Sequence, residues 1–415
     1  MAERRLVEDY HSETAVERRI PGSVVFWDET LRDGEQTPGV HFSPEEKLRI
    51  ATLLSEIGVP LINAGIPVVS DEEARAVELL AHAGLKSDIL AAARTVPTDV
   101  DAVIDSGATH IAIFVAASQV HLRYKLRMTE EQVHAASLAS VRRAKEAGLH
   151  VAFVTEDTVR APFDFVERLY RDVQDAGADR LVVADTVGIM TPLTFRWYLE
   201  EFQRRVHPKE LSVHCHNDFG LATANTLCAI ECGARAPHVC VNGLGERAGN
   251  ASLEEVVVAL EALYGVRTGI RTERLTELSR LVEELSGVPV AANKALVGYN
   301  AFSHEAGIHT HGVLAHTLTY EPLQPHVVGA RRNMILGKHT GKAAVIEKLK
   351  ERGITAPDPL LLELLRRIKA ETESRSKADL LRFLKEYRQL FERPGLSDEE
   401  FWAMVDAVGI GQASA

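Results

Sequence analysis

The sequence is poor in the features that define several protein classes at once. Its four cysteines, Cys215, Cys228, Cys232 and Cys240, lie within one short stretch, and none forms a Cys-x-x-Cys pair. Such pairs are typical of zinc knuckles, and regularly spaced cysteines are typical of disulfide frameworks. Neither structure is indicated, and we expect four free, reduced thiols.

Long apolar runs are also absent. No uninterrupted stretch reaches the roughly 18 residues that a membrane helix needs. The first residues, Met1 to Arg5, have no apolar core of the kind that a signal peptide carries. The sequence therefore predicts a cytoplasmic protein with no membrane partner.

Positive charge is in deficit. The 47 Lys and Arg residues are outnumbered by 59 Asp and Glu, which gives a formal net charge of −12. Nucleic acids and anionic membrane surfaces are bound mainly through basic surfaces, so this balance argues against both as partners. An anionic ligand would have to be attracted by a local group of cations.

What the sequence does contain is a repeated alternation of short apolar runs and amphipathic helical segments. Strands are predicted at residues 24–27, 61–64, 89–92, 110–114, 150–154, 180–184, 211–214 and 238–241. Eight strand and helix pairs over this length are typical of a (β/α)8 TIM barrel. A doubly wound open sheet is the alternative, but no Gly-x-Gly-x-x-Gly turn follows the first strand.

The predicted fold class is therefore α/β, a TIM barrel followed by a mainly helical C-terminal region. We expect an N-terminal arm at residues 1–22, the catalytic barrel at 23–270, a linker and lid subdomain at 271–350, and a helical subdomain at 351–415. The chain is long enough for one large domain of about 250 residues and a second unit.

Charged and polar side chains follow several of the predicted strands. In a TIM barrel the catalytic groups lie at the C-terminal strand ends. His214 and His216 alternate on one face of the seventh strand, and Asp33 follows the first. Two imidazoles and a carboxylate could hold a divalent cation and leave positions open for a substrate. A bare His-x-His more often just ends a surface strand, so the surrounding motifs have to decide.

Four further motifs favour a functional site over a surface strand. They are residues 30–36 (TLRDGEQ), 245–250 (GERAGN), 304–309 (HEAGIH) and 336–341 (LGKHTG). Together with His-x-His-Asn-Asp they resemble the Claisen-condensing branch of the DRE-TIM metallolyase superfamily. That branch contains 2-isopropylmalate, homocitrate, citramalate and Re-citrate synthases, and the similarity extends over residues 23–350.

The resemblance implies a divalent metal ion (Mg, Mn, Zn or Co) as cofactor. The residues at the family's metal-binding positions are Asp33, His214 and His216, with Asn250 in or near the coordination shell. The residues at its substrate and acid–base positions are Arg32, Arg160, Thr186 and Glu156. Arg32 would stabilise the keto oxygen, and an ordinary surface salt bridge is the alternative for Arg160.

The resemblance also implies that part of the site comes from a second chain. In the related synthases the residues at the positions of His309 and Tyr320 take part in proton transfer and reach over the barrel of the neighbouring subunit. A homodimer with shared active sites is therefore expected. The base that removes the acetyl proton stays open between Glu156, His309 with Tyr320, and a bound hydroxide.

The implied reaction joins acetyl-CoA to a 2-oxo acid with release of CoA. The product is a 2-hydroxy-2-carboxymethyl acid, and the enzyme is an acyltransferase that converts acyl to alkyl on transfer (EC 2.3.3 type). Three alternatives remain: a 2-isopropylmalate or citramalate synthase, an acyl-CoA lyase or aldolase on the same barrel, and a non-catalytic relative. The lyases rely on a cysteine in the glycine-rich loop, and residues 243–250 contain none.

Two positions depart from the family pattern. The second strand ends in Asn63 where relatives usually have Glu, and His311 follows His309 where relatives have Asp or Gln nearby. Both changes would make the site less negative. We therefore expect a homocitrate-synthase-like enzyme whose 2-oxo acid has an anionic tail, such as 2-oxoglutarate, oxaloacetate or phosphonopyruvate. Neutral drift is the alternative. The region after residue 350 leaves no room for a large regulatory domain, so feedback control through one is not expected.

Overall fold

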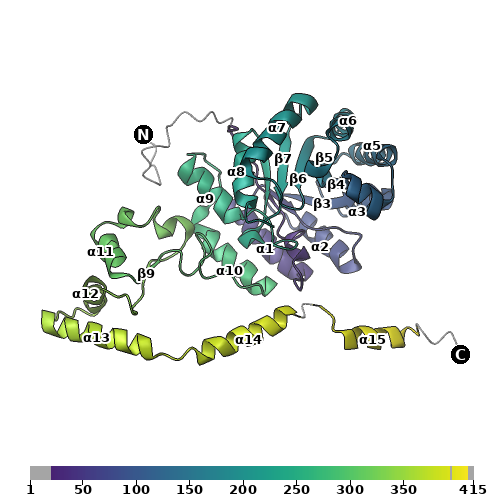
Figure 1. Cartoon of the computed structure of the whole chain (residues 1–415). Helices are drawn as coiled ribbons and strands as arrows, with labels where there is room; N and C mark the ends of the chain where they lie inside the picture. Colours follow the sequence, from purple (N-terminus) through teal and green to yellow (C-terminus); the bar gives the residue numbers. More distant parts are fainter. Residues whose placement is uncertain (1–19, 393–394, 410–415) are drawn as a thin grey trace. The chain divides into compact units, whose positions relative to one another are not determined.

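The structure, a computed structural model, describes residues 20–392 and 395–409. Eight parallel strands pair in chain order, and β8 pairs with β1 to close the barrel (Figure 1). The strands are β1 (Trp27–Asp28), β2 (Leu61–Asn63), β3 (Asp88–Arg94), β4 (His110–Ala116), β5 (His150–Glu156), β6 (Arg180–Asp185), β7 (Leu211–Cys215) and β8 (Ala236–Val239). The predicted TIM barrel is confirmed.

Helices connect successive strands and cover the outside of the barrel. The α-helices are α1 (Pro44–Ile57), α2 (Asp71–His82), α3 (Pro97–Asp105), α4 (Gln119–His121), α5 (Glu130–Glu146), α6 (Phe163–Asp175), α7 (Pro192–Val206), α8 (Ala222–Glu231), α9 (Leu253–Leu263) and α10 (Leu275–Ser286). Short 3-10 helices lie at Gly34–Gln36, Thr158–Arg160, Val241–Gly243, Thr272–Arg274 and Pro325–Val328, and a π-helical turn at Leu122–Leu126.

The barrel interior is filled by one large ring surrounded by small side chains. Trp27 is completely buried and packs with Leu61, Leu90, Val182 and three alanines of β3, β4 and β5. These alanines face one another in register, Ala92 beside Ala112 and Ala112 beside Ala152. Because methyl groups take little space, the interior above the indole can stay open toward the strands' C-terminal ends.

Helix α1 shows how the sequence fixes the elements that surround the barrel. Ser43 caps its N-terminus in a reciprocal arrangement with Glu46, Pro44 occupies the first turn, and Gly58 at φ 100° ends the helix. One residue of α1, Lys47, is fully buried and pairs with Glu35 and Glu73. The helix is thereby tied to the segments that follow β1 and β2.

Six strands overlap their predicted ranges with ends that differ by one or two residues, and two strands are shifted along the chain. The first strand is Trp27–Asp28 rather than residues 24–27, and the eighth is Ala236–Val239 rather than 238–241. Val25 still donates a backbone hydrogen bond to Arg235, so the apolar run enters the barrel but regular pairing begins later. Short apolar runs set the presence of a strand better than its limits.

Contacts divide the chain into two compact units. The first comprises the described residues up to 37 together with residues 41–303 and 320–333, and the second comprises residues 38–40, 304–319 and the described residues from 334 onward. The predicted boundaries at 270 and 350 stay a prediction. Residues 1–19 of the predicted N-terminal arm lie outside the residues that the structure describes.

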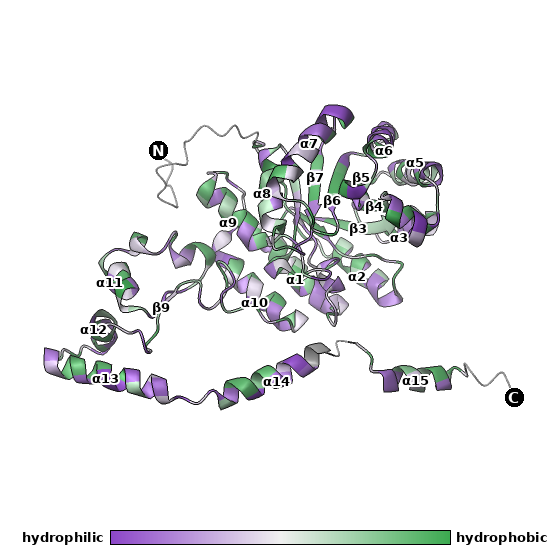
Figure 2. Ribbon diagram, in the orientation of Figure 1, coloured by the Kyte–Doolittle hydropathy of each residue, from purple (hydrophilic) through white to green (hydrophobic). Residues whose placement is uncertain are grey.

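The later part of the chain is mainly helical, as predicted. It contains α11 (Gly307–Ala315), α12 (Lys342–Lys350), α13 (Asp358–Ser374), α14 (Ala378–Glu392) and α15 (Asp398–Ala407), a 3-10 turn at Thr317–Thr319, and a two-stranded sheet of β9 (Ser303–His304) and β10 (Asn333–Met334). Figure 2 shows that α13 and α14 alternate between hydrophobic and hydrophilic residues along their length.

The motifs at 304–309 and 336–341 meet inside the second unit. A Cβ on Gly341 would lie 2.7 Å from Gly307 Cα, so the two backbones approach too closely for any larger residue. The Glu305 carboxylate accepts a hydrogen bond from the backbone of His339. The glycines of these motifs therefore have a packing role.

All four cysteines are free and buried, as expected. Among the described residues, no helix combines the length and the apolar character needed to cross a bilayer.

Candidate active site

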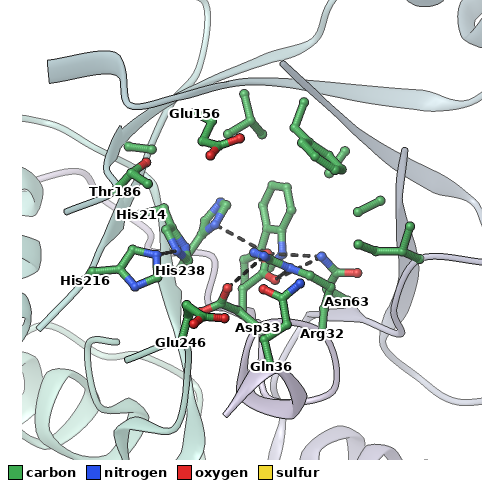
Figure 3. Close-up of a pocket in the computed structure, with 18 of the residues that line it drawn as sticks. Arg32, Asp33, Gln36, Asn63, Glu156, Thr186, His214, His216, His238 and Glu246 are labelled. Atoms are coloured by element: carbon green, nitrogen blue, oxygen red, sulfur yellow. Dashed lines mark hydrogen bonds and ion pairs between the residues drawn. The ribbon is translucent and has the colours of Figure 1, made fainter. Parts of the chain in front are cut away.

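A cavity of about 340 Å³ lies within the barrel, at the C-terminal ends of its strands (Figure 3). Every strand contributes at least one lining residue. In chain order these are Trp27, Asn63, Ala92, Ala112, Val154, Ala184, His214 and His238. Charged residues from the following loops, including Glu29, Arg32, Asp33, Lys125 and Arg247, complete the lining. The volume is in the lower part of the range for small-molecule sites, roughly 300–1,000 Å³.

Asp33, His214 and His216 form one cluster at this cavity, with ligand atoms that all lie within 4.8 Å of one another. Asp33 is 3% exposed, and each histidine is 6% exposed. The Nε2 atoms of the two imidazoles are 3.1 Å apart. Figure 3 shows both rings on the same side of the cavity, with Asp33 below them.

This cluster fits a divalent cation. Burial lowers the pKa of His214 and of His216 below the ordinary value, so both rings are neutral and can offer a lone pair at neutral pH. Two imidazoles and one carboxylate are ligands suited to Zn²⁺, Mn²⁺ or Co²⁺. The donor chemistry thus supports a metal at the predicted position.

The carboxylate of Asp33 is held by two donors. Arg32 Nη1 lies 2.9 Å from Oδ1, and Asn250 Nδ2 donates to Oδ2. Burial would raise the pKa of Asp33, but the Arg32 charge and the Asn250 hydrogen bond outweigh it, and the pKa lies below its usual range. Asn250 thus touches the predicted ligand Asp33 and orients it.

The glycine-rich loop allows this close approach. Gly245 has φ 151°, and a Cβ on it would lie 2.8 Å from Asp33 Oδ2 and overlap the Asn250 amide. Since an L side chain rarely adopts this conformation and would displace both groups, glycine is required here.

Asn63 lies beside a buried carboxylate. Its Nδ2 is 3.1 and 3.0 Å from the two oxygens of Glu29, and Arg32 Nε is 2.6 Å from the same carboxylate. Burial raises the pKa of Glu29, while Arg32 and Asn63 oppose that rise. Asn63 therefore serves as a donor to the buried Glu29 carboxylate, and the predicted effect of this position on the charge of the site stays a prediction.

Of the predicted residues at the ends of β5 and β6 and just after them, two line the cavity and one does not. Glu156 and Thr186 line the cavity; Glu156 pairs with Lys125 Nζ at 2.6 Å, and Thr186 Oγ1 accepts a hydrogen bond from the Asp157 backbone. Arg160 is not among the lining residues. Its Nε lies 2.8 Å from Asp157 Oδ1, in an ion pair beside the site.

Among the cavity residues that sequence reasoning did not anticipate, His238 has the most unusual surroundings. His238, on β8, is buried, and its ring lies 3.8 Å from the Trp27 ring. Its Nδ1 lies 3.4 Å from Glu29 Oε1, but neither ring nitrogen has a hydrogen-bond partner among the described residues. Burial lowers its pKa well below the ordinary value, so it is neutral. The available signal was a histidine inside an otherwise apolar strand.

The other predicted residues lie after the barrel. His309 and His311 are exposed on α11 of the second unit, and Tyr320 follows the 3-10 turn at Thr317–Thr319. The lining of the cavity, among the described residues, comes from the barrel strands and the loops between them. The predicted roles of these three residues in proton transfer and substrate binding stay predictions.

Comparison with known proteins agrees with this geometry. Residues 23–282 match the HMGL-like family, and residues 296–376 match the homocitrate synthase post-HMGL domain. The first match covers more than half of the chain and includes every residue of the metal cluster. The chain belongs to the HMGL-like family.

Within this family, its relatives include several synthases. The chain is 48% identical to homocitrate synthase AksA of Methanopyrus kandleri over 94% of its own length and 98% of the relative's. It is 47% identical to 2-isopropylmalate synthase of Methanocaldococcus jannaschii, over 85% and 68% of the two lengths. For (R)-citramalate synthase CimA of the same organism the identity is 46%, over 88% and 74%.

Solved structures support the barrel. Hydroxymethylglutaryl-CoA lyase from Pseudomonas aeruginosa matches with a TM-score of 0.59 and 22% identity, covering 65% of this chain and 95% of the lyase. At that identity the likeness shows the fold alone. The predicted membership of a superfamily that contains homocitrate, isopropylmalate and citramalate synthases is confirmed.

Proposed function

We propose that this protein condenses acetyl-CoA with a 2-oxo acid and releases CoA. The acetyl methyl carbon loses a proton to a base and forms a bond with the keto carbon. The keto oxygen becomes a hydroxyl, and water then cleaves the thioester to a carboxylate and the CoA thiol. The observation that carries the proposal is the buried cluster of Asp33, His214 and His216 in a barrel whose relatives are synthases.

A divalent cation held by these three residues would supply Lewis-acid polarisation of the keto group. Arg32 is positioned to assist, because its guanidinium lies in the cavity and is fixed by Glu29 and Asp33. A fixed donor aimed at an oxygen that gains negative charge commonly contributes about 3 to 4 kcal/mol. The hydroxyl of Thr186 accepts from Asp157 and can donate its own proton to a carboxylate of the 2-oxo acid.

Three candidates remain for the base: a bound hydroxide, and two that belong to the chain itself. Glu156 lines the cavity and is held by Lys125, so it can accept a proton from a group placed beside it. His309 with Tyr320 is the second candidate, and it requires a homodimer in which the region after the barrel serves the partner's site. We propose this homodimer, in the cytoplasm, with the two substrates as its small-molecule partners. Arg160 can bind a carboxylate of the substrate only if its ion pair with Asp157 is broken.

The chemical character of the tail of the 2-oxo acid distinguishes the synthases from one another. The sequence predicts an anionic tail from Asn63 and His311, which favours a homocitrate-like acceptor. The structure gives Asn63 a different use, as a donor to Glu29. The prediction therefore rests on His311, and a substrate panel must decide it.

The test is release of free thiol from acetyl-CoA by the purified protein with Mg²⁺ or Mn²⁺, for a panel of 2-oxo acids. We expect release that depends on the 2-oxo acid and is abolished by a chelator. A protein that releases no thiol with any acid of the panel, but cleaves acyl-CoA products in the reverse direction, would contradict the proposal and favour a lyase.

A further inference from the structure

One side of the cavity is apolar. Figure 3 shows several carbon-only side chains at its top and right, across from His214 and His216, with Glu156 at the top and Asn63 at the right as the labelled polar groups beside them. The apolar lining residues are Ile66, Ala92, Ala112, Phe114, Val154 and Ala184. They come from β3 to β6 and from the segment after β2, whereas the metal cluster comes from β7 and the segments after β1 and β7. A substrate bound at the cluster would therefore direct the rest of its body at apolar side chains.

This apolar side is also spacious. Three of its six residues are alanines, and Ala92 and Ala112 are direct neighbours in register. Phe114 and Val154 form the next neighbouring pair, and both are only partly buried by protein. Ala92 and Ala112 pack against Trp27 in the barrel core and also line the cavity, so their small side chains leave room above the indole that a ligand can fill.

The charges of the cavity do not provide for a second anion. Three cations line it, and each already has a carboxylate partner: Arg32 pairs with Glu29 and Asp33, Lys125 with Glu156, and Arg247 with Asp218. The lining carboxylates are Glu29, Asp33, Glu156 and Glu246. An anionic tail would leave water for a site with no unpaired lining cation among the described residues, which is costly.

We infer that the acceptor has a bulky, uncharged apolar tail, larger than an isopropyl group and best represented by an aryl ring. The inference rests on the proposed condensation and specifies its second substrate. A flat ring can lie over the methyl groups of Ala92 and Ala112, with the rings of Phe114 and Trp27 beside it. Ala92 and Ala112 then determine specificity, because their small size admits the ring.

The test compares phenylpyruvate, 2-oxoisovalerate, pyruvate, 2-oxoglutarate and phosphonopyruvate by thiol release from acetyl-CoA. We expect kcat/KM for phenylpyruvate to exceed that for each other acid by about tenfold or more, since single methylene groups in apolar pockets already give about 10- to 200-fold. Preference for 2-oxoglutarate or phosphonopyruvate, or for the smaller 2-oxoisovalerate or pyruvate, would overturn the inference while leaving the condensation intact. Absence of release with all acids would instead contradict the condensation.

Matched variants locate the effect. Ala92→Val adds two carbons inside the cavity, and Ala93→Val adds the same two on the opposite face of β3, away from the lining. We expect Ala92→Val to lower kcat/KM for phenylpyruvate about tenfold or more while pyruvate retains its value. Ala93→Val should change both acids by the same factor. Equal losses for both acids in Ala92→Val and in a second variant, Ala112→Val, would contradict the assignment of these alanines.

Discussion

At the scale of single residues, the site is built from buried charges that balance one another. Glu29, Arg32 and Asp33 are consecutive or nearly so in the chain, and they form a connected set with Asn63 and Asn250. Each carboxylate is buried, so its stability depends on its donors. Replacing a donor in this set by a second acid should therefore be strongly destabilising.

Asn63→Asp is the direct test of that balance. The new carboxyl would lie beside Glu29 in a buried place, and we expect the free energy of unfolding to fall by about 3 kcal/mol at pH 8. The loss should shrink toward pH 5, because the introduced carboxyl, once protonated, can again donate to Glu29. Thermal unfolding of wild type and Asn63→Asp at the two pH values measures this loss of stability. A loss of the same size at both pH values would contradict the predicted repulsion between the two carboxylates.

Asp28 gives a second prediction. Burial raises its pKa from 3.8 to about 7, although hydrogen bonds from Thr30 oppose the rise. At pH values between the ordinary carboxyl pKa of 3.8 and about 7, the native state binds the Asp28 proton more tightly than the unfolded chain does. The free energy of unfolding should therefore fall as the pH rises through that window, by at most about 1.4 kcal/mol per pH unit.

Asp28→Asn removes this titration. The difference in Tm between wild type and Asp28→Asn should move in favour of the variant as the pH rises from about 5 to about 8. A constant difference over that range would show that Asp28 is ionised throughout.

At the scale of elements, the position of α1 depends on one buried cation. Lys47 Nζ lies 2.7 Å from Glu35, 2.6 Å from Glu73 and 3.1 Å from the Ala64 carbonyl. These groups belong to the segment after β1, to α2 and to the segment after β2. Removing the cation leaves two carboxylates without their charge partner.

Lys47→Met should accordingly lower the free energy of unfolding by about 3 to 5 kcal/mol. Arg49→Met is the matched control, because Arg49 is exposed on the same helix and its loss should change stability by about 0.5 kcal/mol or less. Urea unfolding of the two variants measures the difference, and equal effects would mean that the ion pairs of Lys47 do not stabilise the fold.

The elements themselves were largely predictable from sequence. The alternation of apolar runs with amphipathic segments marks all eight strands, and His214 of β7 and His216 just after it meet in one cluster, as the alternation of an extended chain predicts. What sequence could not show is how loops bring side chains together. Asn63 and Glu29 are 34 positions apart, and only the barrel makes them partners. The alternation likewise gave no sign that Lys125 lines the cavity, and for His238 the one available signal was its place in an apolar strand.

At the scale of the whole molecule, the central question is whether two chains complete one site. His214→Ala and His309→Ala should each be inactive alone if both residues serve catalysis. In a dimer with shared sites, a mixture of the two variants forms some sites with both wild-type residues, and symmetry gives roughly a quarter of wild-type activity after random exchange.

Thiol release by the refolded or co-expressed mixture measures this complementation. No recovery, in a mixture shown to exchange subunits, would mean that His309 acts within its own chain or that the protein acts as a monomer.

The measurement that tests the account most directly is the metal content of wild type and His214→Ala, determined together with thiol release. We expect about one divalent ion per wild-type chain, and loss of both the ion and the 2-oxo-acid-dependent release in His214→Ala. His41→Ala, a change at an exposed histidine after β1, should retain both. A His214→Ala protein with full metal content and normal thiol release would contradict the assignment of the metal site and the chemistry proposed for it.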